Sequence, residues 1–526
     1  MIDMCRNLTY TLLSLLVLGF YIAFYVPYGF EDTDTGFILG LSWQFYNGSR
    51  PFAEILYVRP PSSFILHSLS ILAGDYALFI DRSFMYIQIF VSSLLSILLL
   101  ANKFKYLKPE RHFIFILSFI VSVHTFPPMS WHTIDGIFFL VLGLYFLLTF
   151  HSTPYILVGS LFITLGVLSK QSFYLFPILL LIYLYLTKNK KKLFVSLTSF
   201  ILYFSTFAFI LYLFDIWGTY ITLTTGQISF YDFLDVGFYH YFKVAPDLLL
   251  FLFPIGLIYL FQRLNKHTSI KINIFNLTMY WSLTINLLYY LSYDSYILPS
   301  KNFIDVFFNL TILYGFYMYF HKNHEEYLLP ILLLSISWMA GISWGYNTVI
   351  LFSSPIIFMT YVIFRGNKDN TYIKKSSLII FSIIVFYVGY DDPFQNDKRS
   401  KLVFEMSTVY PKLKGIYSDR DTYLKYQELK RLSEKHNKNF IVLPDVTLAH
   451  YLSNTTNPIG IDWVINAEIN DNDTKLINRI EDKDLVVFIK KGKLSTHRKF
   501  GSRVTSYIKD NWNHVGSYHY FDVFKK

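Results

Sequence analysis

The sequence predicts a polytopic α-helical membrane protein of about thirteen transmembrane helices, followed by a small α/β domain outside the cytoplasm. Three observations predict this fold class. Of 526 residues, 53% are apolar and only 16% are charged, whereas a soluble globular chain has about 25% charged residues. Apolar runs of about the 20 residues that a helix needs to cross a bilayer recur along residues 1–390. Beyond residue 390 the charge density rises, and short strand-like and helical patterns replace the long apolar runs.

The apolar runs set the order of the predicted crossings. The first run follows Arg6 and ends in Val-Pro-Tyr-Gly-Phe without a small-residue cleavage pattern. We therefore expect a retained helix there and not a signal peptide. The predicted crossings lie near residues 8–27, 84–101, 112–127, 134–150, 154–169, 173–187, 193–214, 247–261, 272–292, 303–320, 327–343, 348–364 and 376–390.

Lysines and arginines between the crossings predict the topology. Alternate loops hold most of them, as in the lysine-rich run 188–192. Because cytoplasmic loops carry an excess of lysine and arginine, this pattern places the N-terminus in the cytoplasm and residues 391–526 outside it. The lysine usage and the lack of eukaryotic signals favour a bacterial inner membrane. The opposite, outer loops contain Arg50, Arg59, Arg82, Lys170, Lys243 and Lys301.

Two long outer loops lie within the transmembrane module of residues 1–390. They cover residues 28–82 and 215–246. In the first loop, Phe37–Tyr46 and Phe64–Ala73 are too short to span a bilayer and have the pattern of helices that lie in the membrane interface. Loops of this length in a compact protein are usually functional or disordered, and these are too aromatic to be disordered. We therefore expect both loops to be functional.

Residues 391–526 are predicted to form a separate α/β domain outside the cytoplasm. Apolar strand-like runs occur at Phe440–Leu443 and Leu485–Ile489, and a helical pattern lies between Asp421 and His436.

The overall charge and the cysteine content exclude other kinds of function. The net charge is +10, but the basic residues sit in short loops between apolar runs, whereas residues that bind nucleic acid cluster on one soluble face. We therefore expect no nucleic-acid partner. The single cysteine, Cys5, excludes an intramolecular disulfide and a cysteine-based metal site.

Three carboxylates follow the first predicted helix. Glu31, Asp32 and Asp34 lie within about two helical turns of its end. A carboxylate at the membrane surface can act as a general base for an acceptor hydroxyl. The alternative is that these residues solvate a helix end or cap the helix that begins near Gly36.

Isolated cations mark the outer edge of the predicted helices. Arg59 precedes Pro60-Pro61, Arg82 opens the second crossing, and Lys170-Gln171 ends the fifth. Cations there run against the charge bias of the topology, and a phosphate or pyrophosphate ligand is a reason to place them there. The alternative is that their charged ends reach lipid headgroups, as is common at helix ends.

His132 and Asp135 share a helical face at another outer helix end. The pair could relay a proton, contact substrate or form half of a metal site. The sequence offers no second ligand pair, so no metal is indicated, and a hydrogen-bonded interfacial histidine is the preferred interpretation.

The order of these features resembles the GT-C superfamily of membrane glycosyltransferases, which includes protein mannosyltransferases and the aminoarabinose transferases that modify lipid A. The resemblance covers the first 190 residues through motifs and the remainder mainly through topology. The motifs are Asp34-Thr35-Gly36, Asn47-Gly48-Ser49-Arg50-Pro51-Phe52, Arg59-Pro60-Pro61, Arg82 and Leu168-Ser169-Lys170-Gln171.

The resemblance implies a role for each candidate residue. An acidic residue of the first outer loop is the catalytic base in that family, which makes Asp34 the first choice and Asp32 the second. The family often has Asp-Glu here, whereas this chain has the run 31–34 of Glu-Asp-Thr-Asp, so the choice between the two aspartates stays open. By position, the resemblance makes Lys170 and Arg82 the first candidates to bind the phosphate of a polyprenyl-phosphate sugar. Arg59 is a weaker candidate, because its place is often His in relatives. The C-terminal domain would assist acceptor binding or folding.

The predicted function is therefore sugar transfer from a polyprenyl-phosphate donor to an envelope glycan, lipid such as lipopolysaccharide, or protein acceptor on the non-cytoplasmic face. Direct displacement by one acceptor predicts inversion at the anomeric carbon. Two rival functions remain. A polysaccharide polymerase or ligase would carry its key charges, typically arginines, in a large loop of the second half, where loop 215–246 has just Lys243. A transporter would show paired repeats and ionisable residues near the bilayer midplane.

Overall fold

A computed structural model describes residues 2–123, 127–225, 300–342, 349–363, 389–394, 397–470, 472–492 and 503–526, together with a few short pieces between these ranges. Almost all of the predicted crossings at 247–261, 272–292 and 376–390 lies outside the described residues. The same holds for Lys243 in the second outer loop.

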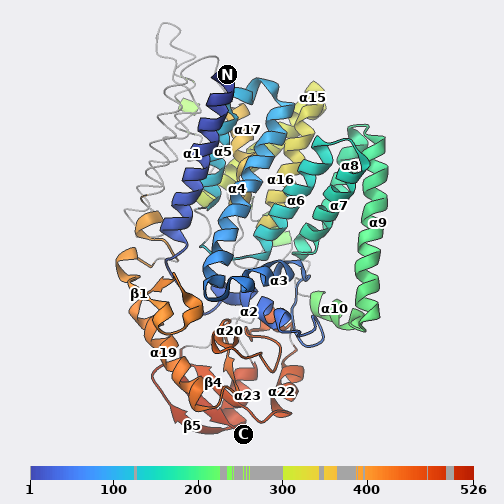
Figure 1. Cartoon of the computed structure of the whole chain (residues 1–526). Helices are drawn as coiled ribbons and strands as arrows, with labels where there is room; N and C mark the ends of the chain where they lie inside the picture. The colour runs from blue at the N-terminus through green and yellow to red at the C-terminus, as the bar shows by residue number, and fades with distance from the viewer. Residues whose placement is uncertain are drawn as a thin grey trace.

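The apolar runs that fall within the described residues form helices over most of their lengths, and these helices make one bundle (Figure 1). Among the described residues, three helical stretches are long and apolar enough to cross a bilayer, namely Ser62–Lys103, His132–Thr149 and Lys190–Leu213. The total number of crossings stays a prediction. The helices of the bundle are α1 (Ile2–Tyr25), α4 (Ala77–Lys103), α5 (Arg111–Val123), α6 (His132–Thr149), α7 (Thr153–Val167), α8 (Phe176–Leu186), α9 (Lys190–Leu213), α15 (Ser300–Lys322), α16 (Leu328–Gly341) and α17 (Ser354–Ile363).

Helix packing in the bundle depends on small residues and on an apolar outer surface. A Cβ atom on Gly143 of α6 would lie 2.6 Å from the carbonyl oxygen of Gly159 in α7, so only glycine permits this approach. Close contact through small residues is typical of helices in membranes. Along α9, large side chains such as Phe194, Ile201 and Tyr212 are exposed. An apolar surface of this kind is suited to lipid and not to water.

The first outer loop folds at one end of the bundle, between the bundle and the C-terminal domain (Figure 1). It contains α2 (Asp34–Tyr46), α3 (Ser62–His67) and the 3₁₀ segment η1 (Ser68–Tyr76). The hydroxyl of Ser42 in α2 donates to the carbonyl oxygen of Phe64 in α3 over 2.9 Å. The predicted short helices therefore exist, but α2 is buried along most of its length instead of lying open at the membrane interface. The reason is that the C-terminal domain packs on it.

The C-terminal domain is built on a four-stranded sheet. Strand β3 (Phe440–Leu443) pairs in parallel with β4 (Val486–Lys490), β6 (Phe521–Lys525) pairs antiparallel with β4, and β5 (Asn513–Ser517) forms the edge beyond β6. The predicted strands correspond to β3 and β4. The predicted helix corresponds to α19, and a short pair, β1 (Phe404–Glu405) and β2 (Tyr417–Ser418), precedes it. The helices of the domain are α19 (Arg420–Lys435), α20 (Ala449–Ser453), α21 (Asn466–Ile469), α22 (Asp473–Glu481) and α23 (Arg503–Asn511).

The outer loop and the C-terminal domain share their hydrophobic cores. One buried cluster joins Phe37 of α2 to Ile441 of β3, and a second joins Leu39 of α2 to Val442 of β3. Successive side chains of a strand point to opposite faces of its sheet. Both faces of β3 are therefore covered, and α2 contributes to both clusters, so the two parts of the chain stabilise each other.

Two glycines of α2 allow the C-terminal domain to approach. A Cβ atom on Gly40 would lie 2.4 Å from the carbonyl oxygen of Thr447, and one on Gly36 would lie 2.1 Å from Cγ of Leu448. Real Cβ atoms essentially never approach other heavy atoms this closely. At Gly40 the obstacle is backbone, which cannot rotate away.

We expect Gly40→Ala to lower the free energy of unfolding by about 1–3 kcal/mol, because overpacking of a tight contact costs this much. Thermal unfolding of the purified protein in detergent measures the effect. Gly19→Ala in α1 is the matched control, since a Cβ atom there would meet no heavy atom within 4 Å. Equal unfolding temperatures for Gly40→Ala and the unmodified protein would contradict this description of the interface.

Candidate functional site

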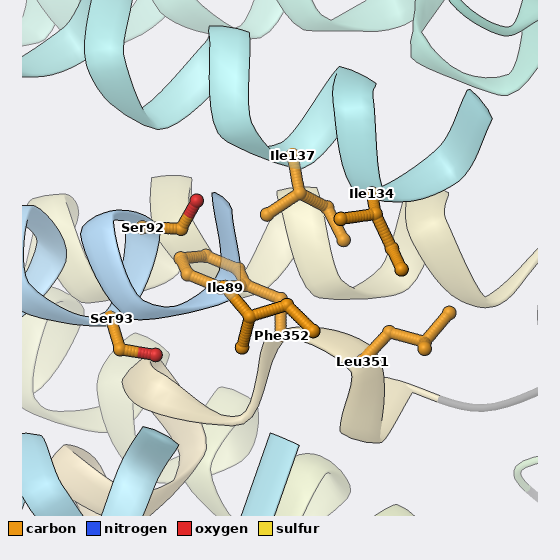
Figure 2. Close-up of a pocket in the computed structure, with 7 residues that line it drawn as sticks. All are labelled: Ile89, Ser92, Ser93, Ile134, Ile137, Leu351 and Phe352. Carbon is orange, nitrogen blue, oxygen red and sulfur yellow. The ribbon is translucent and has the colours of Figure 1, made fainter. Parts of the chain in front are cut away.

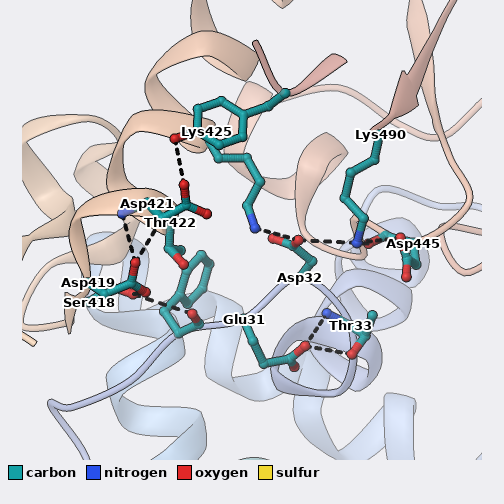
Figure 3. Close-up of polar contacts among 12 residues, drawn as sticks. Glu31, Asp32, Thr33, Ser418, Asp419, Asp421, Thr422, Lys425, Asp445 and Lys490 are labelled. Atoms are coloured by element: carbon teal, nitrogen blue, oxygen red, sulfur yellow. Dashed lines mark hydrogen bonds and ion pairs between the residues drawn. The ribbon is translucent and has the colours of Figure 1, made fainter. Parts of the chain in front are cut away.

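Glu31 caps helix α2. Its carboxylate accepts hydrogen bonds from the backbone N–H and the hydroxyl of Thr33, at 2.6 and 2.5 Å, and from the backbone N–H of Thr35 at 2.5 Å (Figure 3). The first N–H groups of a helix have no partner within the helix, so a carboxylate placed here satisfies them and favours the positive end of the helix dipole. The structure thus gives Glu31 the capping role that the sequence offered as the alternative to catalysis.

Asp32 joins the outer loop to the C-terminal domain. Its carboxylate lies 2.6 Å from Nζ of Lys425 in α19 and 3.2 Å from Nζ of Lys490 in β4 (Figure 3). Lys490 also pairs with Asp445 at 2.5 Å. In addition, the backbone N–H of Thr447 donates to the carbonyl oxygen of Asp32. The charge of this carboxylate is therefore used in holding two segments of the chain together.

The side chain of Asp34, the first residue of α2, makes no hydrogen bond or ion pair with any other residue that the structure describes. Burial raises the pKa of its carboxyl group to about 8, with further increases from the charges of Glu31 and Glu468 and an opposing effect from Arg59. Of the three carboxylates at the start of α2, Asp34 is thus the one that no described side chain or backbone group occupies. A base that must take a proton from a substrate requires this freedom.

Arg59 interacts electrostatically with Asp34 and is bound by a side chain of the C-terminal domain. Its two terminal nitrogens donate to the two carboxylate oxygens of Glu468, at 2.5 and 2.6 Å. The guanidinium carbon also lies 5.6 Å from the ring centre of Phe37 and 5.9 Å from that of Tyr57. The sequence predicted that Arg59 binds an anionic ligand. In the structure its anionic partner is the carboxylate of Glu468.

Lys170 reaches the same region from the turn between α7 and α8. The backbone N–H of Ser62 donates to Leu168, and the Gln171 amide donates to the carbonyl oxygen of Val58 at 2.6 Å, so this turn packs against the chain around Arg59. The ammonium of Lys170 is buried and makes one long hydrogen bond, of 3.5 Å, to a carbonyl oxygen in α16. Burial, together with the charge of Arg59, lowers its pKa to about 7. In the described part of the chain this lysine has no anionic partner.

His132 and Asp135 lie at the start of α6 and have different surroundings. His132 is buried and interacts electrostatically with Arg59 and Lys170, and its Nδ1 atom has no hydrogen-bond partner among the described residues. The carboxylate of Asp135 accepts from His67 at 2.9 Å and from Gln88 at 2.7 Å. His132 thus lies within electrostatic range of Arg59 and Lys170, whereas Asp135 belongs to the buried network around His67.

The network around His67 fixes the outer loop to the bundle. The second ring nitrogen of His67, in α3, lies 2.6 Å from the carboxylate of Asp81 in α4, which also accepts a hydrogen bond from Ser130. All of these side chains are buried. Because buried polar groups are stable only when they are paired, the network holds α3 in one position on α4 and α6, and thereby holds the Arg59-Pro60-Pro61 turn that precedes α3.

Arg82 lies apart from Arg59 and Lys170. It is fully buried in α4, donates to the carbonyl oxygen of Val26 at 3.1 Å, and packs 5.6 Å from the ring centre of Phe394. The charges that act on it come from Glu31, Tyr86 and Asp81. The structure therefore places Arg82 beside the end of α1 and not with the cations of the site.

The bundle contains a small hollow among the residues that the structure describes. It is lined by Ile89, Ser92 and Ser93 of α4, Ile134 and Ile137 of α6, and Leu351 and Phe352 (Figure 2). The hollow leaves no room for a water molecule. Its apolar lining and size indicate a packing gap and not a binding site.

No protein-family model matches the sequence, and no curated protein matches it. Solved structures do match. The chain is similar to ArnT from Cupriavidus metallidurans in the apo state, at 10% identity and a TM-score of 0.49, over 100% of this chain and 98% of that one. It is also similar to an oligosaccharyltransferase from Archaeoglobus fulgidus, at 12% identity and a TM-score of 0.43, over 87% of this chain and 64% of that one.

The structure brings some of the predicted residues together and separates others. Asp34 and Lys170 both interact electrostatically with Arg59. His132 interacts electrostatically with Arg59 and Lys170. Glu31, Asp32, Asp135 and Gln171 have structural partners of their own. Sequence reasoning missed Glu468 entirely, because it lies 409 residues from Arg59 along the chain and belongs to no motif.

Proposed function

We propose that the protein is a membrane glycosyltransferase that moves a sugar from a polyprenyl-phosphate donor to a hydroxyl acceptor at the non-cytoplasmic face of a bacterial inner membrane. The acceptor is an envelope glycan, lipid or protein. The apolar helices would hold the prenyl chain, and the outer loop would hold the sugar. The resemblance of the sequence motifs to GT-C enzymes supports the class of reaction.

One observation carries the proposal. In the part of the chain that the structure describes, the carboxylate of Asp34 has no side-chain partner and the buried ammonium of Lys170 has no anionic partner, and each interacts electrostatically with Arg59. Burying an unpaired cation is costly, and a phosphate ligand would remove that cost. Transfer from a sugar phosphate needs a free acid to take the acceptor's proton and a free cation to stabilise the phosphate.

The proposed reaction assigns one role to each group. Asp34 accepts the proton of the acceptor hydroxyl while its oxygen forms a bond to the anomeric carbon. The bond between that carbon and the phosphate oxygen breaks, and its electron pair stays on the phosphate. Lys170 stabilises the charge that builds up there, which lowers the barrier more than it strengthens ground-state binding. A single displacement inverts the anomeric configuration.

Envelope analysis tests the proposal in cells. Deleting the protein should remove one sugar from an envelope glycan, lipid or glycoprotein, which mass spectrometry detects. The unmodified chain should restore that sugar, whereas Asp34→Asn, present at the same membrane level, should not. The missing mass identifies a hexose, pentose or amino sugar and so names the donor. Identical envelope glycans with and without the protein would contradict the proposal.

A further inference from the structure

The C-terminal domain reaches into the candidate site through one side chain. Glu468 lies in α21 and is nearly fully buried, with a side-chain exposure of 4%, while that of Arg59 is 13%. The two form parallel hydrogen bonds of 2.5 and 2.6 Å. Paired, charge-assisted hydrogen bonds between arginine and carboxylate fix the orientation of both groups. The position of the Arg59 guanidinium is therefore set by a residue of another domain.

Helix α21 is itself anchored to the transmembrane module. Asn470 follows it in a left-handed conformation, and its amide nitrogen donates to the carbonyl oxygens of Thr222 at 3.0 Å and Thr225 at 3.1 Å. The same stretch, which ends helix α10 (Trp217–Thr224), receives a hydrogen bond from Gln171 at the carbonyl oxygen of Thr224. Gln171 follows Lys170 directly. Glu468 and Lys170 are thus positioned against the same piece of backbone.

Three charged groups interact electrostatically with Asp34. Glu31 precedes it in its own loop, Arg59 comes from the turn before α3, and Glu468 comes from α21. Arg59 itself interacts electrostatically with Tyr57, His132 and Lys170. Arg59 is therefore a cation with two acids near it, and it is bonded to Glu468 and not to Asp34.

We propose that Glu468 is a positioning residue of the transfer site, which holds Arg59 away from Asp34 and so keeps the proposed base unpaired. The proposal rests on the proposed function and extends the active centre to the C-terminal domain. An arginine released from Glu468 would turn to the nearest remaining carboxylate. An ion pair between Arg59 and Asp34 would occupy the oxygen that must take the proton, and it would weaken Asp34 as a base.

Glu468→Gln tests this role, because glutamine keeps the shape of the side chain and removes its charge. Loss of a nearby negative charge and release of Arg59 both favour the ionised form of Asp34. The acid limb of kcat/KM for transfer from a radiolabelled polyprenyl-phosphate sugar in proteoliposomes should therefore move to lower pH. The maximal rate should fall, since a weaker base takes the proton less readily. Glu468→Asp, which keeps the charge, should restore the original pH limb at least in part.

Arg479→Gln is the matched control. Arg479, in α22, also joins the C-terminal domain to the outer loop, through the carbonyl oxygens of Ala53 and Glu54. It makes this contact without a carboxylate beside Asp34. A purely structural role for Glu468 predicts that both variants lower the unfolding temperature and leave the pH limb in place. That result would overturn the proposal.

An infrared titration separates failure of this proposal from failure of the proposed function. The carboxyl band that Asp34→Asn removes reports the protonation of Asp34 without any substrate. In the unmodified protein its midpoint should lie near pH 8, and in Glu468→Gln it should lie lower. If transfer is absent but the midpoint moves, the proposed function fails and the positioning role stands. If transfer is present and the midpoint does not move, the positioning role fails alone.

Discussion

Replacing Asp34 with asparagine should reduce kcat for sugar transfer by a factor of about 10² to 10⁴, which is the usual contribution of a general base. Asparagine has nearly the same shape, so donor binding and folding should change little. The measurement is single-turnover transfer from a radiolabelled lipid-linked sugar in proteoliposomes. The effect is specific because Asp34 is the acid at the start of α2 that bonds to no described residue.

The neighbouring acids serve as controls for this experiment. Glu31→Gln and Asp32→Asn remove carboxylates of the same loop that already have structural partners. Both should lower the unfolding temperature, because they remove a helix cap and an inter-domain ion pair, and both should retain most of the transfer rate. A large loss of kcat in Asp32→Asn with Asp34→Asn still active would exchange the roles of the two aspartates.

Lys170→Met should reduce kcat/KM for the donor by a factor of about 10² to 10³, the range found when one electrostatic stabiliser of a reaction is removed. Methionine fills the same space, so the loss reports the charge. Use of the donor should suffer more than use of the acceptor, since the phosphate belongs to the donor. Unchanged donor kinetics would remove Lys170 from the site.

The same lysine should also shape the pH dependence. Transfer requires Asp34 without its proton, so activity rises with pH through its pKa of about 8. It requires Lys170 with its proton, so activity falls with pH through its pKa of about 7. The two limbs predict a narrow optimum of kcat/KM between pH 7 and 8. Because a guanidinium stays charged throughout this range, Lys170→Arg should abolish the alkaline fall. An alkaline limb that persists in Lys170→Arg would assign it to another group.

Local pattern was sufficient to predict some of the elements of the fold. The strand prediction Phe440–Leu443 matches β3, because a short apolar run between polar segments has few alternatives. The pattern did not predict that α2 would be buried, since a helix that is apolar on several faces is compatible with lipid and with a protein core alike. The strands β5 and β6 were not predicted, because β5 is polar and exposed along most of its length.

Residues of the candidate site could be predicted only where the sequence departs from the charge pattern expected of its topology. Arg59 and Lys170 were found because cations on the outer side oppose the charge bias of the topology. Asp34 could not be separated from Asp32, since both are acids at nearly the same distance from α1. What distinguishes them is Lys425 and Lys490, which lie far away in the sequence and pair with Asp32 and not with Asp34.

The shared hydrophobic clusters have a consequence for biogenesis. Phe37 and Leu39 leave the ribosome some 400 residues before the strand Phe440–Leu443 that covers them. During synthesis the first outer loop must therefore keep these apolar side chains uncovered until the last part of the chain has been made. Contacts so distant in sequence form slowly. A chain that stops early cannot assemble the centre, so incomplete copies in the membrane would be inert.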